Sequence, residues 1–301
     1  MAPEDPSGER REFPLRPAVV RFGRLAHLLT LPARLAGTVD TRLVLDTGIG
    51  VNLLSSELAE RVGWKPDGTR FTGRRMSGQA VSVPLGTLPS LAVGRSAWAD
   101  AVFGTIDTTG FPDPLRGIGG FLSLGLFEGR RLVIAPRAGE VRIGEEPTPK
   151  ELRDRLAEVP VHLVREGPSV QLFLDLLLPT GTAVRVEVDT GSEALILDER
   201  FMAGLGVRPD DPKVRRTEGV DETGQNYVRW ATRLDGAIAL ADASTVRAPA
   251  GPTLFQRIIY DGLVGGGFLD RFDTGYDLAT GRMSFAPLSP PTSANAGLPR
   301  P

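Results

Sequence analysis

The sequence contains two copies of one pattern, and this repeat constrains the fold more than any other feature. When the chain is shifted by 143 residues, Asp46–Gly48 falls on Asp189–Gly191, and both read Asp-Thr-Gly. Further along the offset becomes 142, and Gly120–Leu122 falls on Gly262–Val264. A single register with one residue of slippage, held over about 90 positions, indicates two copies of one folding unit.

Each of these tripeptides ends a largely apolar run. Leu43–Leu45 precedes the first and Val186–Val188 the second, which is typical of a buried strand with an acid at its end. Glycine permits a sharp turn there and a close approach by another segment. A third copy, Asp273–Gly275, has no counterpart in the first half, where the equivalent residue is Arg131. We expect this third copy to form a surface hairpin turn away from the site.

The composition excludes several classes of function. The 301 residues carry a formal net charge of −2, which gives no reason to expect a nucleic acid or an anionic membrane as partner. The absence of cysteine excludes a disulfide framework and a zinc–thiolate site. His27 and His162 are the only histidines, so histidine metal sites and Ser-His-Asp catalysis are disfavoured, and we expect no metal and no cofactor. No apolar run approaches ~18 residues, so no transmembrane helix is predicted.

The length and the 41% hydrophobic content predict two domains. The expected divisions are a disordered tail at 1–15, an N-terminal lobe at 16–146, a linker at 147–157, a C-terminal lobe at 158–287 and a disordered tail at 288–301. A short helical stretch is expected at 150–159. The first residues lack the apolar core of a secretory signal. This favours a cytoplasmic protein, while a periplasmic or exported one stays open if a leader is missing from the sequence.

Short strands, frequent turns and two brief helices predict a mostly β protein. One helix is expected to begin after Ser55 or Ser56 and to stop at Gly63. The matching helix of the second half begins at Asp198 and ends around Gly204–Gly206. Each half then closes with a strand hairpin, whose turns are expected at 136–139 and 279–281.

A polar, glycine-containing hairpin is expected after the helix in each half. The first spans 70–86, with Gly73 and Gly78 as candidate turn positions. The second spans 216–233, with its turn near Gly224 and with Tyr227 on the outgoing arm. Two interpretations stay open for both hairpins, namely a flap that covers a substrate and a plain surface loop.

The repeat implies a specific chemistry. Two similar halves, each with an aspartate at a strand end, can pack about a pseudo-twofold axis and bring Asp46 and Asp189 together. Like charges about 3 Å apart cannot both ionise, so the pair shares one proton. The ionised carboxylate then takes a proton from a water that attacks a peptide carbonyl, while the protonated partner hydrogen-bonds the carbonyl oxygen. This hydrolysis needs neither a metal nor a covalent intermediate.

The neighbours of the two aspartates have supporting roles in this scheme. The hydroxyls of Thr47 and Thr190 are expected to point away from the substrate and to bond the backbone of the opposite loop. Gly48 and Gly191 leave room for the carboxylates and offer them backbone N–H donors.

The sequence resembles the aspartic peptidases at these residues, in particular bacterial retropepsin-like proteins that carry two lobes in one chain, as pepsins do. The shared pattern is an apolar pair and Asp-Thr-Gly, then a short helix, and later an apolar-apolar-Gly segment with a closing hairpin; it covers roughly residues 25–287. The resemblance implies a bilobal acid-protease fold, Asp46 and Asp189 as the catalytic dyad, and an extended peptide substrate. A monomer is expected because both lobes are in one chain.

Several positions depart from the pattern of the family. Pepsins have a small hydroxyl residue after each Asp-Thr-Gly that bonds a catalytic carboxylate; Ser192 fits this role, but Ile49 does not. Ser123 replaces a glycine in the first apolar-apolar-Gly segment, and Phe71 is the only aromatic residue in the first hairpin. Glu193 is expected to add a third carboxylate near the dyad and to raise its pKa values. A catalytically inactive, retropepsin-like peptide-binding module is therefore the alternative.

Overall fold

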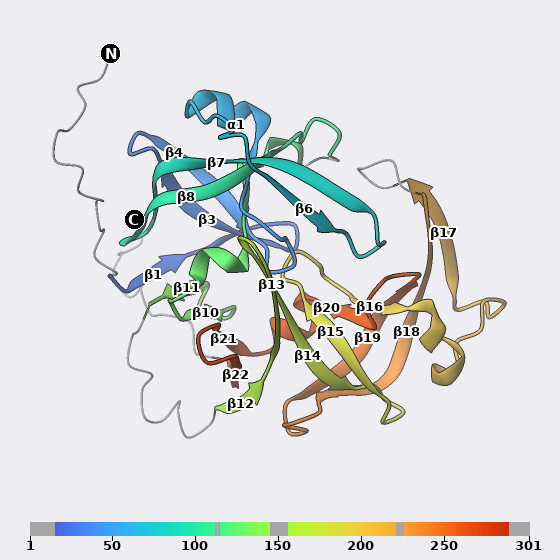
Figure 1. Cartoon of the computed structure of the whole chain (residues 1–301). Coiled ribbons are helices and arrows are strands. Elements are labelled where there is room, and N and C mark those ends of the chain that lie inside the picture. The colour runs from blue at the N-terminus through green and yellow to red at the C-terminus, as the bar shows by residue number, and fades with distance from the viewer. Residues whose placement is uncertain (1–15, 112, 114, 145–155, 221–225, 289–301) are drawn as a thin grey trace, which may run out of the picture.

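The structure is a computed structural model that describes residues 16–111, 113, 115–144, 156–220 and 226–288. It consists of two β lobes and a sheet to which both contribute strands (Figure 1). The predicted mostly β, bilobal fold is thereby confirmed. The expected N-terminal tail, nearly all of the expected linker and nearly all of the C-terminal tail lie outside the described residues. No helix in the described part of the chain is long and apolar enough to cross a membrane.

The first lobe is an eight-stranded sheet in the order β2-β3-β4-β9-β5-β8-β7-β6. Its strands are β2 (Gly23–Leu25), β3 (Leu28–Leu35), β4 (Val39–Leu45), β5 (Leu53–Ser55), β6 (Arg70–Arg74), β7 (Ala80–Val93), β8 (Ser96–Ile106) and β9 (Gly120–Leu122). Three short helical segments accompany them, α1 (Ser56–Arg61), η1 (Leu115–Gly117) and η2 (Leu124–Phe127).

The second lobe has the same strand order, β13-β14-β15-β20-β16-β19-β18-β17. Its strands are β13 (His162–Glu166), β14 (Ser169–Leu177), β15 (Ala183–Val188), β16 (Leu195–Asp198), β17 (Arg215–Val220), β18 (Asn226–Leu240), β19 (Arg247–Gln256) and β20 (Gly262–Val264). Its helical segments are η3 (Glu199–Phe201), η4 (Ala203–Leu205) and α3 (Gly266–Leu269). The two lobes thus match strand for strand in the order that the sequence repeat implies.

A parallel strand pair positions the aspartate of each lobe. In the first lobe β4 pairs with β9, and in the second β15 pairs with β20. The ladders continue one residue beyond the strands, because the N–H of Asp46 donates to the Leu122 carbonyl and that of Asp189 to the Val264 carbonyl, each at 3.0 Å. In each lobe, the strand that precedes Asp-Thr-Gly therefore pairs with the later apolar segment of the same repeat, and the aspartate lies at the end of this pair.

The helix predicted after Ser55 is present. The Ser55 hydroxyl accepts a hydrogen bond from the Leu58 N–H at 3.2 Å, which satisfies one of the free donors in the first turn of α1. In the second lobe Asp198 caps the equivalent segment through the Arg200 N–H at 3.0 Å. That segment forms two 3₁₀ turns instead of an α-helix, and Gly204 in its middle disfavours a regular helix.

The closing hairpins of the two halves join one six-stranded sheet. Its strands, in spatial order, are β1 (Ala18–Arg21), β11 (Glu140–Ile143), β10 (Leu132–Ala135), β21 (Asp273–Asp277), β22 (Arg282–Ala286) and β12 (Ala157–Pro160). The antiparallel contact between β10 and β21 joins the first half to the second. The core is continuous across this sheet, since one cluster of buried side chains includes Leu31 of the first lobe, Tyr276 of the sheet and Leu174 of the second lobe.

Two expectations are wrong in this region. Asp273–Gly275 is not a surface hairpin turn, because it begins β21 and Asp273 is only 4% exposed. The turn that the glycine pattern indicates lies further on, between β21 and β22. The helical stretch expected at 150–159 is also wrong where the structure describes it, because residues 157–159 pair with β22 as part of β12.

Candidate active site

Asp46 and Asp189 lie side by side at the boundary between the lobes. A methyl group added to Gly48 would lie 2.6 Å from Oδ1 of Asp189, and one added to Gly191 would lie 2.5 Å from Oδ2 of Asp46. Each glycine therefore contacts the carboxylate of the opposite lobe so closely that no larger residue fits. The two carboxyl groups are within hydrogen-bonding reach of one another.

Thr47 and Thr190 fasten the two aspartate loops together beneath the carboxylates. The Thr47 hydroxyl donates to the Val188 carbonyl at 2.7 Å and accepts from the Thr190 N–H at 3.0 Å. The Thr190 hydroxyl donates to the Leu45 carbonyl at 2.9 Å and accepts from the Thr47 N–H at 3.0 Å. All four bonds are buried and cross the lobe boundary, so they fix the spacing of the two aspartates.

The two carboxylates receive different sets of donors. Each accepts the N–H of the glycine two residues later, at 2.9 Å for Asp46 and 2.8 Å for Asp189. Asp189 also accepts the Ser192 hydroxyl at 2.5 Å. The equivalent residue of the first lobe is Ile49, which packs against an apolar cluster and brings no hydroxyl. The Ser192 hydroxyl is therefore a side-chain donor that only the second lobe supplies.

The environment of Asp46 favours its protonated form. Burial is the largest cause that raises the pKa of Asp46, and the negative charge of Asp189 raises it further. The N–H of Gly48 acts in the opposite direction but does not cancel these effects. One site therefore holds an acid and a base together at the same pH.

Glu187, and not Glu193, is the third carboxyl near the pair. Glu193 is exposed, whereas Glu187 is 3% exposed. Burial raises the pKa of Glu187 most, followed by the charge of Asp189. The sequence held a signal for this residue, since Glu187 lies two residues before Asp189 in a strand and side chains two apart share a face.

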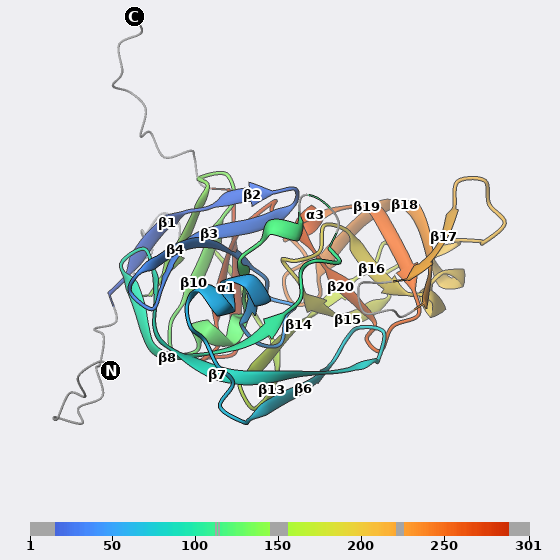
Figure 2. The same cartoon turned by 90° about the horizontal axis from the view of Figure 1, so that it is seen from above.

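The first hairpin crosses from its own lobe to the second. Figure 2 shows β6 and β7 extending in that direction past β14. At the tip, the Ile259 N–H of the second lobe donates to the Met76 carbonyl at 2.9 Å. Gly78 adopts a φ of +86° at the turn, as predicted for a turn position. Gly73 does not turn the chain; it lies within β6, where the Phe71 ring covers it.

The second hairpin is described only in part. Gly224 and the rest of the turn at 221–225 lie outside the described residues, as does the expectation that this turn covers the cleft. Tyr227 is in β18, and its ring lies against Gly219 of β17 and 4.3 Å from the Arg229 guanidinium. Tyr227 thus contacts its own hairpin.

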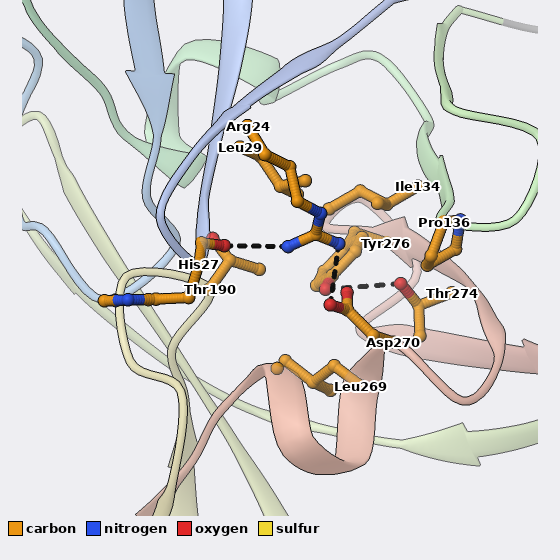
Figure 3. Close-up of a pocket in the computed structure, with 11 residues that line it drawn as sticks. Arg24, His27, Leu29, Ile134, Pro136, Thr190, Leu269, Asp270, Thr274 and Tyr276 are labelled. Carbon is orange, nitrogen blue, oxygen red and sulfur yellow. Dashed lines mark hydrogen bonds and ion pairs between the residues drawn. The ribbon is translucent and has the colours of Figure 1, made fainter.

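Arg24, in β2, and His27, in the turn between β2 and β3, contact the second lobe from the first (Figure 3). Arg24 donates to the His27 carbonyl at 2.7 Å and pairs with Asp270 at 2.6 Å. The His27 Nε2–H donates to the Gly191 carbonyl at 2.9 Å. The sequence has no local signal for this contact, which depends on how the lobes pack.

Ser123, the other departure in the first lobe, has a clear structural role. It is 1% exposed, and both its N–H and its hydroxyl donate to Oδ1 of Asn52, at 2.9 and 3.2 Å. Asn52 in turn donates to the Val102 carbonyl at 2.9 Å. Serine therefore replaces glycine here as part of a buried hydrogen-bond chain behind the first aspartate loop.

Comparison with known proteins agrees with this geometry. Residues 31–125, which include Asp46, match the aspartyl protease family. No curated protein matches the sequence. Among solved structures, the crystal structure of basic 7S globulin from soybean is similar, with a TM-score of 0.54, and the match covers 91% of this chain and 95% of that chain. The identity is 11%, so this likeness shows a shared pepsin-like fold and nothing about chemistry.

Proposed function

We propose that this protein is an aspartic endopeptidase of the two-lobed, retropepsin-like kind, with Asp46 and Asp189 as its catalytic pair. The observation that carries the proposal is the pairing of two carboxyls whose loops are joined by four buried threonine hydrogen bonds. The match of residues 31–125 to the aspartyl protease family supports it. Both carboxyls come from one chain, so the proposed enzyme is a monomer.

The reaction assigns a different role to each aspartate. Asp189, which accepts the Ser192 hydroxyl and the Gly191 N–H, is the base that takes a proton from the attacking water. Asp46 is the acid that hydrogen-bonds the peptide carbonyl as negative charge develops on its oxygen. The water oxygen bonds to the carbonyl carbon, and the C–N bond breaks as the amine leaves with a proton. The β6–β7 hairpin lies where it can cover an extended peptide.

The test is digestion of an unstructured protein across the acidic to neutral pH range. Wild type is compared with Asp46→Asn and Asp189→Asn, and Asp40→Asn is the matched control because Asp40 is an exposed aspartate in β4, the strand that precedes Asp46. Wild type and Asp40→Asn are expected to cleave, and both site variants to be inactive while folded. Cleavage by either site variant at a rate close to that of wild type would contradict the proposal.

An inactive peptide-binding module is the second candidate, and Ile49 is the observation that favours it. Without a hydroxyl at this position, Asp46 lacks a donor that Asp189 has. Peptide binding measured by calorimetry, together with no cleavage by wild type at any pH, would support this candidate.

A further inference from the structure

The side chains beside Asp189 form a polar group, whereas those at the equivalent positions beside Asp46 are apolar. Gln171, Glu187 and Tyr260 form a polar group in the second lobe. By the offsets of the repeat, the equivalent positions of the first lobe are Leu28, Val44 and Ile118, which are buried together in one apolar cluster. A buried carboxyl thus replaces a valine at the position two residues before the aspartate.

Hydrogen bonds and packing hold Glu187 in place. The Gln171 side-chain amide donates to Oε1 of Glu187 at 3.1 Å and to the Tyr260 hydroxyl at 2.8 Å. The Tyr260 ring packs edge-on against Phe173, which lies opposite Glu187 in the β14–β15 ladder. Ile259, next to Tyr260, bonds the tip of the first hairpin. Glu187 is therefore enclosed between the sheet and the loop that contacts the hairpin.

The charged neighbours of Glu187 oppose its ionisation. Asp189 lies on the same face of β15, about 7 Å along the strand, and the charges of Asp189 and Asp46 both raise the pKa of Glu187. Arg185, two residues earlier on that face, instead bonds Asp175 at 2.9 Å. In the loop that follows Tyr260, Asp261 accepts the Arg185 N–H at 2.8 Å and pairs with Arg200. Glu187 thus shares a buried region with two other carboxyls.

We propose that Glu187 is a third titrating carboxyl of the site, which holds its own proton beside Asp46 and Asp189 and tunes the pH range of the pair. An ionised Glu187 adds a negative charge that makes Asp46 hold the shared proton to higher pH. For the separation of about 7 Å between Glu187 and Asp189 and an effective dielectric constant of ~20, the coupling amounts to about 1.5–2 pH units. Glu187 touches neither water nor substrate in this scheme and acts through the pair.

The direct test is a carboxyl ¹³C NMR titration of the full-length protein, which does not depend on cleavage. Wild type is expected to show a glutamate that titrates well above the ordinary range near ~4.3. The signal should be lost in Glu187→Gln and kept in Glu193→Gln, a control at an exposed glutamate in the loop after β15. In Asp189→Asn its midpoint should fall by about 1.5–2 pH units. A Glu187 that titrates in the ordinary range would overturn the inference.

The kinetic consequence rests on the proposed function. The fall of kcat/KM at high pH should move by about 1.5–2 pH units lower in Glu187→Gln, with activity at low pH retained. Glu187→Val, which places the first-lobe residue here, should give the same shift, and Glu193→Gln should give none. Superimposable profiles for all variants would contradict the tuning role. A raised Glu187 titration without any cleavage would contradict only the peptidase function, so the two failures are distinguishable.

Discussion

The two lobes share a strand order but surround their aspartates differently. In the second lobe, the Ser192 hydroxyl bonds Asp189 at 2.5 Å, and the polar group that contains the buried Glu187 lies beside Asp189. In the first lobe, Ile49 and an apolar wall surround Asp46. A symmetric fold thus produces an asymmetric pair, because the Ser192 hydroxyl bonds only Asp189. This difference supports the proposed roles of Asp189 as the base and Asp46 as the acid.

The loops that follow the aspartates also pack differently. Gly265 and Ser123 are equivalent by the offset of the repeat, yet a methyl group on Gly265 would lie 2.2 Å from the Ser192 carbonyl oxygen. In the first lobe the serine fits and bonds Asn52. The second aspartate loop is therefore packed more tightly against its supporting segment than the first.

Gly265→Ala should have the largest effect on this comparison. The added methyl group would overlap the backbone carbonyl of Ser192, which cannot move without displacing Ser192 and its bond to Asp189. We expect a loss of roughly 4 kcal/mol or more in the free energy of unfolding, measured by urea denaturation. Ser123→Gly, at the equivalent position, should lose only about 1–2 kcal/mol with its hydrogen bond. Equal losses in the two lobes would contradict the difference in packing.

Ser192→Ala tests the donors that distinguish the two carboxylates. A hydrogen bond to a charged group contributes about 1.5–3 kcal/mol, which corresponds to roughly a 10–100-fold loss in kcat/KM. Ile49→Ala, the matched change at the equivalent position, removes no donor and should leave kcat/KM within a few-fold of wild type. The comparison fails if the Ile49 variant loses as much activity as the Ser192 variant.

The pKa of Asp46 also predicts how stability depends on pH. Its folded-state pKa is raised, so the folded state binds this proton more tightly than the unfolded state and becomes less stable as pH rises through that range. Asp46→Asn removes this ionisation and should raise Tm at pH 7 by roughly 2 °C per kcal/mol of repulsion relieved. At pH 3, where the aspartate is protonated in both states, the gain should vanish in scanning calorimetry. A gain that is equal at both pH values would contradict the shift.

The smallest effect is expected at the tip of the first hairpin. Gly78 has a φ of +86°, and a methyl group added there would lie 3.0 Å from an Ile259 methyl group, whereas Gly68 has a φ of +93° and open space around it. Alanine at either position should cost about 1 kcal/mol of stability through backbone strain. Only Gly78→Ala should also raise KM, by a few-fold, in steady-state peptide cleavage. An equal rise in KM for Gly68→Ala would show that the contact with the second lobe has no role.

The sequence predicts the features of the site that are local or repeated. Ser55 caps its helix and Asp46–Gly48 ends its strand because adjacent residues decide both. The repeat further predicts that two such loops meet. The bond from Ile259 to Met76 and the burial of Glu187 depend on segments far apart in the chain, which no local pattern specifies. For the same reason the sequence misplaces Asp273, whose β21 strand is defined by its partners β10 and β22.

The most direct test of the account is a double-mutant cycle across the lobe boundary. On one peptide, kcat/KM is compared for wild type, Asp46→Asn, Asp189→Asn and the double variant. If the carboxyls act as one acid–base unit, each single change should cost about 10²–10⁴-fold, and the double variant should be scarcely worse than either single variant. Losses that multiply in the double variant, or substantial activity in one single variant, would contradict a shared site.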